Sequence, residues 1–179
     1  MKIAHCGPDI PFVPETRVGF WFLGTQTWTT HVLKVALDDL ERLMTQRLSS
    51  YPVVLDVGCG QVNSFHLLIE HFSPQRLIGV DAEEKCLQRA RVKLLQEKVP
   101  IELRHCDIAA LDMADASVDL VFCHQTFHHL VQQQMALAQM FRVLKPGGLL
   151  LFAESTRAYI YSWVIRVCCR HPMHVQRSA

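Results

Sequence analysis

The chain has 179 residues, a length that suits a single domain large enough to bury a core. Half of its residues are hydrophobic, 20% are charged, and the formal net charge is +1 at pH 7. The composition is that of an ordinary globular protein, and a net charge this small produces no strong overall electrostatic field. We therefore expect no nucleic-acid binding and no stable membrane insertion.

The cysteines show neither the spacing of a metal site nor that of a disulfide framework. No C-x-x-C pair occurs, the number of cysteines is odd, and most stand within apolar runs. Buried free thiols in a reducing cytoplasm fit this usage, and the N-terminus lacks the apolar region of a secretory signal. We therefore expect a cytoplasmic protein without a bound metal. The seven cysteines are Cys6, Cys59, Cys86, Cys106, Cys123, Cys168 and Cys169.

The first fifty residues precede the core of the chain. Pro8, Pro11 and Pro14 indicate an extended arm over residues 1–15, and the aromatic stretch RVGFWFLGTQTW follows it. Residues 32–48 carry apolar side chains on one helical face and charged side chains on the other, which predicts an amphipathic helix. We interpret residues 1–50 as an arm and a helix that can form a lid.

Strands and helices alternate between residues 51 and 156. Short apolar runs bounded by glycine, proline or polar residues predict the strands, and amphipathic runs predict the helices. This alternation predicts an α/β fold with a doubly wound, mostly parallel sheet and helices on both faces. Residues 157–179 are expected to form a helix and a tail, the helix running from about Ala158 to Cys169. Strands are expected at 53–57, 76–82, 101–107, 117–124 and 149–154, and helices at 63–72, 83–98 and 131–144.

Glycines and polar residues follow the expected strands at their carboxyl ends. In a doubly wound sheet these ends meet at one edge, where ligands bind. Each of these residues, taken alone, could equally serve in a turn or as a helix cap. The evidence for a ligand site is that several of them meet at one edge of the sheet. They are Asp56, Gly58 and Gly60 after the first strand, Asp81 after the second, Asp107 after the third, and His124 and Gln125 after the fourth.

The spacing at this edge narrows the class of ligand. Asp81 lies about twenty residues beyond the glycine turn, the distance at which a carboxylate accepts hydrogen bonds from ribose hydroxyls. A dinucleotide fingerprint would need glycine in place of Asn63, and no G-K-[ST] phosphate loop occurs. These observations favour an adenosine-bearing cofactor that is not a dinucleotide.

Four stretches occur in a fixed order over most of residues 53–154: VLDVGCG, GVDAEE, CDIAALDMADASVDLVFCHQTFHHL and FRVLKPGGLLLFAE. In this combination the chain resembles the class I S-adenosylmethionine-dependent methyltransferases, especially small-molecule enzymes of the methyltransferase domain 11 type. The resemblance implies a Rossmann-like fold, S-adenosyl-L-methionine as the cofactor and a small-molecule methyl acceptor.

The resemblance also implies a set of cofactor-binding residues. The turn would line the methionine end of the cofactor, Asp81 would take the ribose hydroxyls, and Asp107 with Ile108 would recognise adenine. His124 would border the sulfonium and the acceptor. The full set is Asp56, Gly58, Cys59, Gly60, Asp81, Ala82, Asp107, Ile108 and His124.

An acceptor hydroxyl must lose a proton during methyl transfer. His124 and His128 are the candidate catalytic bases by position and by the ordinary pKa of histidine. For His128 a cap or packing role at the start of the next helix is the alternative. Trp21 and Trp28 are candidate acceptor contacts if the arm forms a lid, and packing of helix to sheet accounts for these aromatic residues equally well.

The chain departs from the family pattern in two ways, one that affects the cofactor-binding turn and one that affects the edge of the sheet. Val62 stands where such loops usually have a third glycine, which would restrict the turn or narrow the space above it. Family members usually add a sixth and a seventh strand, so the fifth strand is expected near an open edge. The chain is then a fragment of a longer protein, or an assembly such as a homodimer covers that edge.

Three functions remain after these considerations. The first is a methyltransferase acting on a small molecule. The second is a binding or regulatory module that keeps the cofactor site without catalysis, which Val62 and the absent strands favour. The third is an RNA or protein methyltransferase, which would predict a basic surface or an N-P-P-[YF] motif after the fourth strand, where this chain has CHQTFHH.

Overall fold

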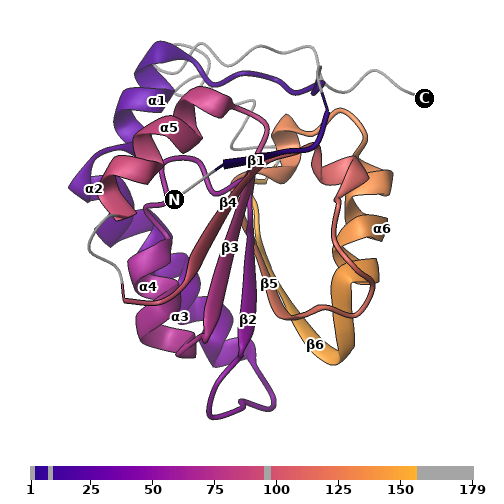
Figure 1. Cartoon of the computed structure of the whole chain (residues 1–179). Coiled ribbons are helices and arrows are strands. Elements are labelled where there is room, and N and C mark those ends of the chain that lie inside the picture. Colours follow the sequence, from indigo (N-terminus) through magenta and orange to yellow (C-terminus); the bar gives the residue numbers. More distant parts are fainter. Residues whose placement is uncertain (1–2, 8–9, 95–97, 157–179) are drawn as a thin grey trace.

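A computed structural model describes residues 3–7, 10–94 and 98–156. In this part of the chain six strands form one sheet in the order β1-β4-β3-β2-β5-β6, and all neighbouring strands are parallel (Figure 1). The helix expected at Ala158–Cys169 lies outside the described residues. The strands are β1 Ile3–His5, β2 Val53–Val57, β3 Arg76–Asp81, β4 Ile101–His105, β5 Val118–His124 and β6 Leu144–Ala153.

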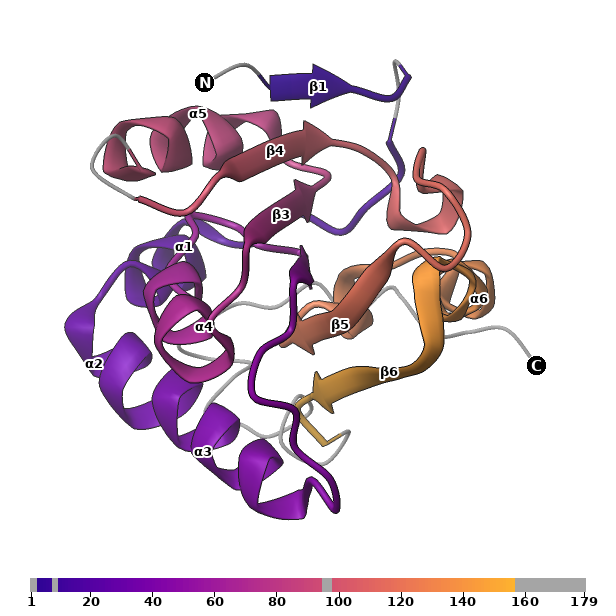
Figure 2. The ribbon, with the colours of Figure 1, turned by 60° about the horizontal axis from the view of Figure 1, so that its bottom comes forward.

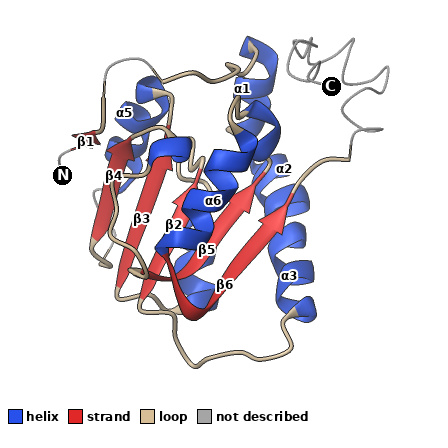
Figure 3. Ribbon diagram, turned by 90° about the vertical axis from the view of Figure 1, so that its right-hand side faces the viewer, coloured by secondary structure: helices blue, strands red, loops and turns tan. Residues whose placement is uncertain are grey.

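Helices cover both faces of the sheet, as the sequence predicts (Figure 3). One core joins the sheet to Leu37 of α3, Phe65 of α4 and Leu87 of α5, and a second core joins it to Met140 of α6. No helix within the described ranges combines the length and apolar character needed to cross a bilayer. The α-helices are α1 Arg17–Leu23, α2 Gln26–Trp28, α3 Lys34–Leu43, α4 Phe65–Phe72, α5 Glu84–Lys93 and α6 Gln133–Val143, with 3-10 turns at Ile108–Ala110 and Phe127–His129 and a π turn at Thr29–Leu33.

Strand β2 lies inside the sheet, between β3 and β5. Val54 faces the core under α4 while Leu55 and Val57 face the core under α6, as expected when successive side chains point to opposite faces. Asp56 is only 3% exposed and accepts a short hydrogen bond from the hydroxyl of Ser64. A buried carboxylate therefore lies next to the end of the strand that leads into the glycine turn.

The N-terminal arm differs from its expected form because it contributes a strand. Residues Ile3–His5 add β1 to the outer side of β4, at the edge of the sheet opposite β6 (Figure 2). The register aligns His5 with His105, which brings the next residue of each strand together. Cys6 and Cys106 consequently form a disulfide, with Cα atoms 4.9 Å apart. The expectation of free thiols is wrong for this pair and is confirmed for the buried Cys59, Cys86 and Cys123.

Several element boundaries differ from those expected. Helix α3 ends at Leu43, not near residue 48, and α4 begins at Phe65. Strand β6 begins at Leu144, because the Lys145–Gly148 segment lies within it as an irregularity where the register to β5 shifts. In the described part of the chain β6 is the outermost strand on its side, so a homodimer through this edge stays a prediction.

We predict that Gly58→Ala destabilises the fold far more than Gly60→Ala. Both glycines have positive φ, 73° and 51°, but a Cβ at Gly58 would collide with the Thr126 side chain, whereas nothing lies within 4 Å of a Cβ at Gly60. We expect a loss of about 2–4 kcal/mol for Gly58→Ala and about 1 kcal/mol for Gly60→Ala in urea unfolding. Equal losses would contradict this account of the turn.

Candidate functional site

A cavity opens at the carboxyl ends of the central strands. The space between its lining residues is about 980 Å³, a value that includes open solvent. Two groups of residues, one at the strand ends and one in the N-terminal segment, form much of its lining. The strand ends contribute Asp56, Gly58, Cys59, Gly60, Asp81, Ala82, Ile108 and His124, and the N-terminal segment contributes Phe12, Val13, Glu15, Phe20, Leu23 and Trp28.

The glycine turn is tied to the end of the neighbouring strand β3. The amides of Gly58 and Cys59 both donate to the carbonyl oxygen of Val80, at 2.8 and 3.0 Å. The amide of Gly60 donates to Oδ2 of Asp81 at 2.7 Å. The turn and the carboxylate that the sequence singles out are therefore joined directly.

Burial governs the charge of the two aspartates in the cavity wall. Desolvation raises the pKa of Asp81 to about 6, although the amides of Glu83 and Gly60 donate to its oxygens and lower it. Desolvation likewise raises the pKa of Asp56 to about 7, against the hydrogen bond from Ser64. A ligand that carries positive charge would favour the ionised form of both groups.

His124 ends β5 in an aromatic environment. Its ring stacks on Phe122 with an interplanar angle of 9°, and its centroid lies 5.6 Å from that of Trp28. Desolvation lowers the pKa of His124 to about 4, so the ring is neutral at neutral pH. His124 can therefore face a cationic group without charge repulsion.

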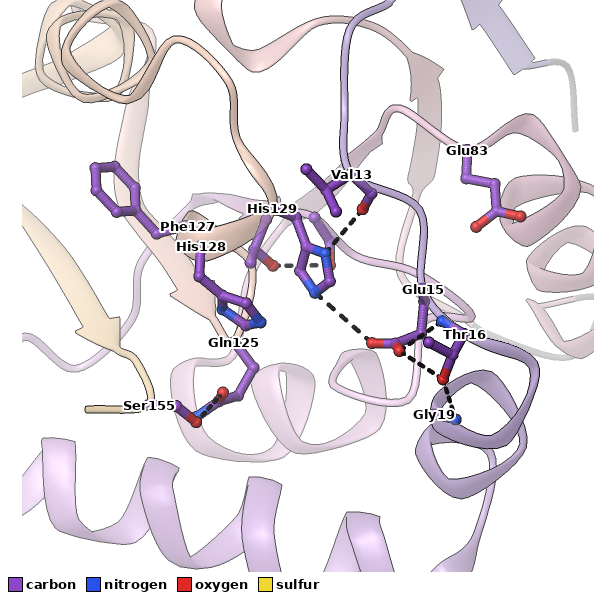
Figure 4. A network of polar contacts seen from close by, with 12 residues as sticks. Val13, Glu15, Thr16, Gly19, Glu83, Gln125, Phe127, His128, His129 and Ser155 are labelled. Atoms are coloured by element: carbon purple, nitrogen blue, oxygen red, sulfur yellow. Dashed lines mark hydrogen bonds and ion pairs between the residues drawn. The ribbon is translucent and has the colours of Figure 1, made fainter. Parts of the chain in front are cut away.

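The neighbouring histidines His128 and His129 have different partners, and Figure 4 shows those of His129. His128 pairs its Nδ1 with Oε1 of Glu154 at 2.7 Å, and Glu154 also accepts from the Phe127 amide. Burial would raise the pKa of Glu154, but these hydrogen bonds outweigh it and hold that pKa below its usual range. His129 instead lines the cavity, with Nδ1 2.8 Å from the carbonyl oxygen of Val13 and Nε2 3.6 Å from Oε2 of Glu15.

The structure brings most of the expected site residues together. All the expected cofactor residues except Asp107 line the cavity, and so does Trp28. Asp107 caps the following 3-10 turn, where its Oδ1 accepts from the amide of Ala109 at 2.8 Å. His128 and Trp21 do not line the cavity, and Trp21 is 69% exposed.

Sequence reasoning missed Glu15 and His129 as residues of the cavity. The segment containing Glu15 was expected only to be extended, and its contact with His129 spans more than 100 positions of the chain. The pair His128-His129 was visible as a motif, but which ring faces the cavity depends on the turn at Phe127–His129. Only the folded arrangement separates the two rings.

Val62 takes the backbone conformation that a glycine would favour. Its φ is 57°, in the left-handed region, which is a strained conformation for a β-branched residue. The side chain is 6% exposed and packs in the core under α4, and it does not line the cavity. Val62 thus adopts the turn at a steric cost and leaves the space above it open.

The fold and the site define a class of protein, the class I S-adenosylmethionine-dependent methyltransferases. The model of a methyltransferase domain family matches residues 55–152, more than half of the chain, so the chain belongs to this family. The match covers β2 to β6 and with them every strand end that lines the cavity.

Individual relatives match similar parts of the chain. A trans-aconitate 2-methyltransferase of Azoarcus sp. strain BH72 is 33% identical over 129 residues, 69% of this chain and 49% of the relative. A malonyl-[acyl-carrier protein] O-methyltransferase of Coxiella burnetii is 36% identical over 114 residues, 64% of this chain and 37% of the relative. The chain thus spans less than half the length of these curated relatives.

A solved structure supports the fold. Phosphoethanolamine N-methyltransferase 2 of Haemonchus contortus, in complex with S-adenosylhomocysteine, superposes with a TM-score of 0.63 at 23% identity, over 74% of this chain and 30% of that one. At this identity the likeness is one of fold.

We predict that Val62→Gly changes the free energy of unfolding by no more than about 1 kcal/mol, because relief of the strained φ offsets the lost apolar burial. The matched control is Val57→Gly, at a buried position of β2 where no strain is relieved. That variant should lose about 3 kcal/mol or more in urea unfolding. A loss at Val62 as large as that at Val57 would show that the turn is not strained.

Proposed function

We propose that this chain binds S-adenosyl-L-methionine in the cavity and supports transfer of its methyl group to a small neutral or cationic acceptor. The observation that carries the proposal is the joining of the glycine turn to Asp81 at the wall of one cavity. Because the chain spans less than half of its curated relatives, the activity of the whole protein is part of the proposal.

The residues of the wall fit the adenosyl cofactor. Each oxygen of Asp81 accepts one backbone hydrogen bond and has a further lone pair for a ribose hydroxyl. The space above Gly60 is open, so a ligand can approach the backbone closely. Ile108 offers an apolar surface to adenine, and Asp107 would contribute an acceptor to the adenine amine from the cap that it forms.

The cofactor supplies, when bound, a methyl group on a positively charged sulfur. The chain contributes alignment and a suitable electrostatic environment, since in-line displacement needs chiefly correct positioning. Asp56 and Asp81 provide negative charge, and His124 provides a polar ring that stays neutral. Trp28 packs beside His124 and would border the acceptor.

The charged side chains that line the cavity determine which charge the methyl acceptor can carry. Its ionisable wall contains Glu15, Asp56, Asp81 and Glu83 together with His124 and His129, and no described lining residue is Lys or Arg. An anionic acceptor would face several carboxylates without a fixed cation to offset them. The names of two relatives point to acidic acceptors, trans-aconitate and a malonyl carrier. We propose that this chain differs, and takes a neutral or cationic hydroxyl or amino compound.

His129, and not His128, is the candidate catalytic base, because it lines the cavity together with His124. The carbonyl of Val13 only accepts hydrogen bonds, so Nδ1 of His129 carries the proton and the neutral ring has its lone pair on Nε2. That nitrogen is directed toward Glu15 in the cavity wall, where an acceptor proton could be received and the resulting charge stabilised. His124, desolvated and neutral, would position the acceptor.

The first test concerns Asp81. Its carboxylate form accepts the ribose hydroxyls, so protonation on the acid side of its pKa of about 6 should weaken binding. We expect the affinity for S-adenosylhomocysteine to be nearly constant above pH 7 and to fall by up to about tenfold per pH unit below pH 6. Calorimetry from pH 5 to 7.5 measures this. Asp81→Asn should lose about 1–3 kcal/mol of binding at pH 7.5 and flatten the profile; an unchanged profile would refute the assignment.

The second test separates the two histidines. With a panel of neutral hydroxyl and amino compounds as acceptors, His129→Asn should lower kcat for S-adenosylhomocysteine release by about 10²–10⁴-fold. His128→Asn, which loses the pairing with Glu154 and the ring contact with His129, should lower it by less than about tenfold. The cofactor Kd should be similar in both variants. A larger loss at His128 would return the catalytic role to that residue.

The same measurements address the non-catalytic alternative. Cofactor binding without release of S-adenosylhomocysteine from any acceptor, in the longest form of the protein, would favour a binding or regulatory module. Absence of cofactor binding would reject both functions. Preferential turnover of carboxylates would overturn the acceptor class while leaving the methyltransferase proposal intact.

A further inference from the structure

The Cys6–Cys106 disulfide joins two walls of the cavity. Cys106 follows β4 and precedes Asp107 and Ile108, and its amide donates to the carbonyl of Asp81 at 3.2 Å. Cys6 follows β1 and begins the segment that continues to the cavity-lining residues Phe12 and Val13. A covalent bond across 100 positions therefore connects the arm to the side of the cavity that holds Asp81 and Ile108.

Besides the disulfide, the start of the arm is held by the pairing of β1 with β4, by the hydrogen bond from the Cys6 amide to the His105 carbonyl, and by exposed contacts of His5 with His105 and Glu84. Strand β1 has only three residues, of which Ala4 and His5 are exposed and Ile3 is partly buried. Beyond Cys6, the arm is attached near His129, where the Val13 amide donates to the His129 carbonyl at 3.1 Å and Phe12 forms an antiparallel bridge with Leu130. Without the disulfide, the described restraints on the arm before that second attachment would be the short edge strand, the Cys6 amide hydrogen bond and the exposed contacts of His5, all of them non-covalent.

Cys6 differs in accessibility from the other described cysteines. Cys6 is partly exposed, whereas Cys106 is fully buried. Burial also raises the pKa of the thiols of Cys59, Cys86 and Cys123, which keeps them protonated and poor nucleophiles. Exchange chemistry among these five cysteines is therefore directed to the Cys6 sulfur.

We propose that Cys6 and Cys106 are a reversible dithiol–disulfide site for low-molecular-weight thiols such as glutathione, and that their bond sets how firmly the arm is held over the cavity. Its consequence for cofactor affinity rests on the proposed function. A glutathione thiolate attacks the Cys6 sulfur, the Cys6–Cys106 bond breaks, and Cys106 leaves as a thiolate that takes up a proton. A second glutathione thiolate then attacks the mixed disulfide, which releases Cys6 as a thiol and forms glutathione disulfide. Two electrons pass from two glutathione molecules to the protein.

The test begins with the redox equilibrium. The full chain is equilibrated in buffers of varied glutathione to glutathione disulfide ratio, free thiols are trapped by alkylation, and peptides containing each cysteine are quantified by mass spectrometry. Cys6 and Cys106 should become protected together in one two-electron transition while Cys86 stays alkylated after denaturation at every ratio. If Cys6 and Cys106 never become linked, the proposal is overturned.

The second measurement follows the arm without any ligand. Amide hydrogen exchange at Val13, whose N–H is bonded to His129, should accelerate by about fivefold or more on reduction, because local opening becomes easier. The melting temperature should fall by about 5 °C or more. Cys6→Ser, at a partly exposed position, should match the reduced protein under both conditions. Equal exchange at Val13 in the two redox states would reject control of the arm.

Cofactor binding is measured last. Calorimetry with S-adenosylhomocysteine should give a Kd about fivefold or more higher for the reduced protein, with no redox dependence in Cys6→Ser. Equal Kd values in the two states would reject the link to affinity. If neither state binds the compound, the proposed function fails, and exchange at Val13 still decides whether the disulfide controls the arm.

Discussion

The hydrogen bond from the Gly60 amide to Asp81 is the contact on which the site depends. It joins the turn after β2 to the end of β3, and the two strands are held in register from Val53 and Arg76 to Val57 and Val80. Gly58, Gly60 and Val62 in this turn all adopt positive φ. One backbone geometry thus fixes the shape of the cavity wall and the position of its central carboxylate.

This arrangement carries a cost in stability that the surrounding core offsets. Asp56 and Asp81 both have raised pKa values, so ionising them in the folded protein without a ligand is unfavourable. Val62 adds backbone strain next to them. The compensation comes from the apolar layers on both faces of the sheet, in which residues such as Leu55, Leu68 and Met140 are fully buried. The backbone strain and the buried carboxylates thus lie close together. A cationic ligand bound there would reduce the free-energy cost of ionising the carboxylates.

The features that the sequence predicts are those that depend on residues close to one another in the chain. Alternating apolar runs predict the parallel sheet, and the strand at 53–57 with the glycines that follow it predicts the turn, because each depends on neighbouring residues. The Cys6–Cys106 bond and the contact of Glu15 with His129 depend on pairing across 100 or more positions. The sequence alone does not decide the role of Asp107 for a related reason, since a carboxylate after a strand can face a ligand or cap the next turn, and its contact with adenine stays a prediction.

The N-terminal arm connects the chemistry of the cavity to its covalent structure. Its backbone fixes the tautomer of His129 through Val13, and its Glu15 side chain faces the same ring. The arm is held at one end by the Cys6–Cys106 bond and at the other by the bridge of Phe12 to Leu130. Loosening either attachment would therefore change both access to the cavity and the orientation of its candidate base. Because β1 contributes little buried surface of its own, the disulfide is the stronger restraint at the first attachment. The redox state of Cys6 and Cys106, which lie outside the proposed catalytic centre, therefore affects the geometry of that centre.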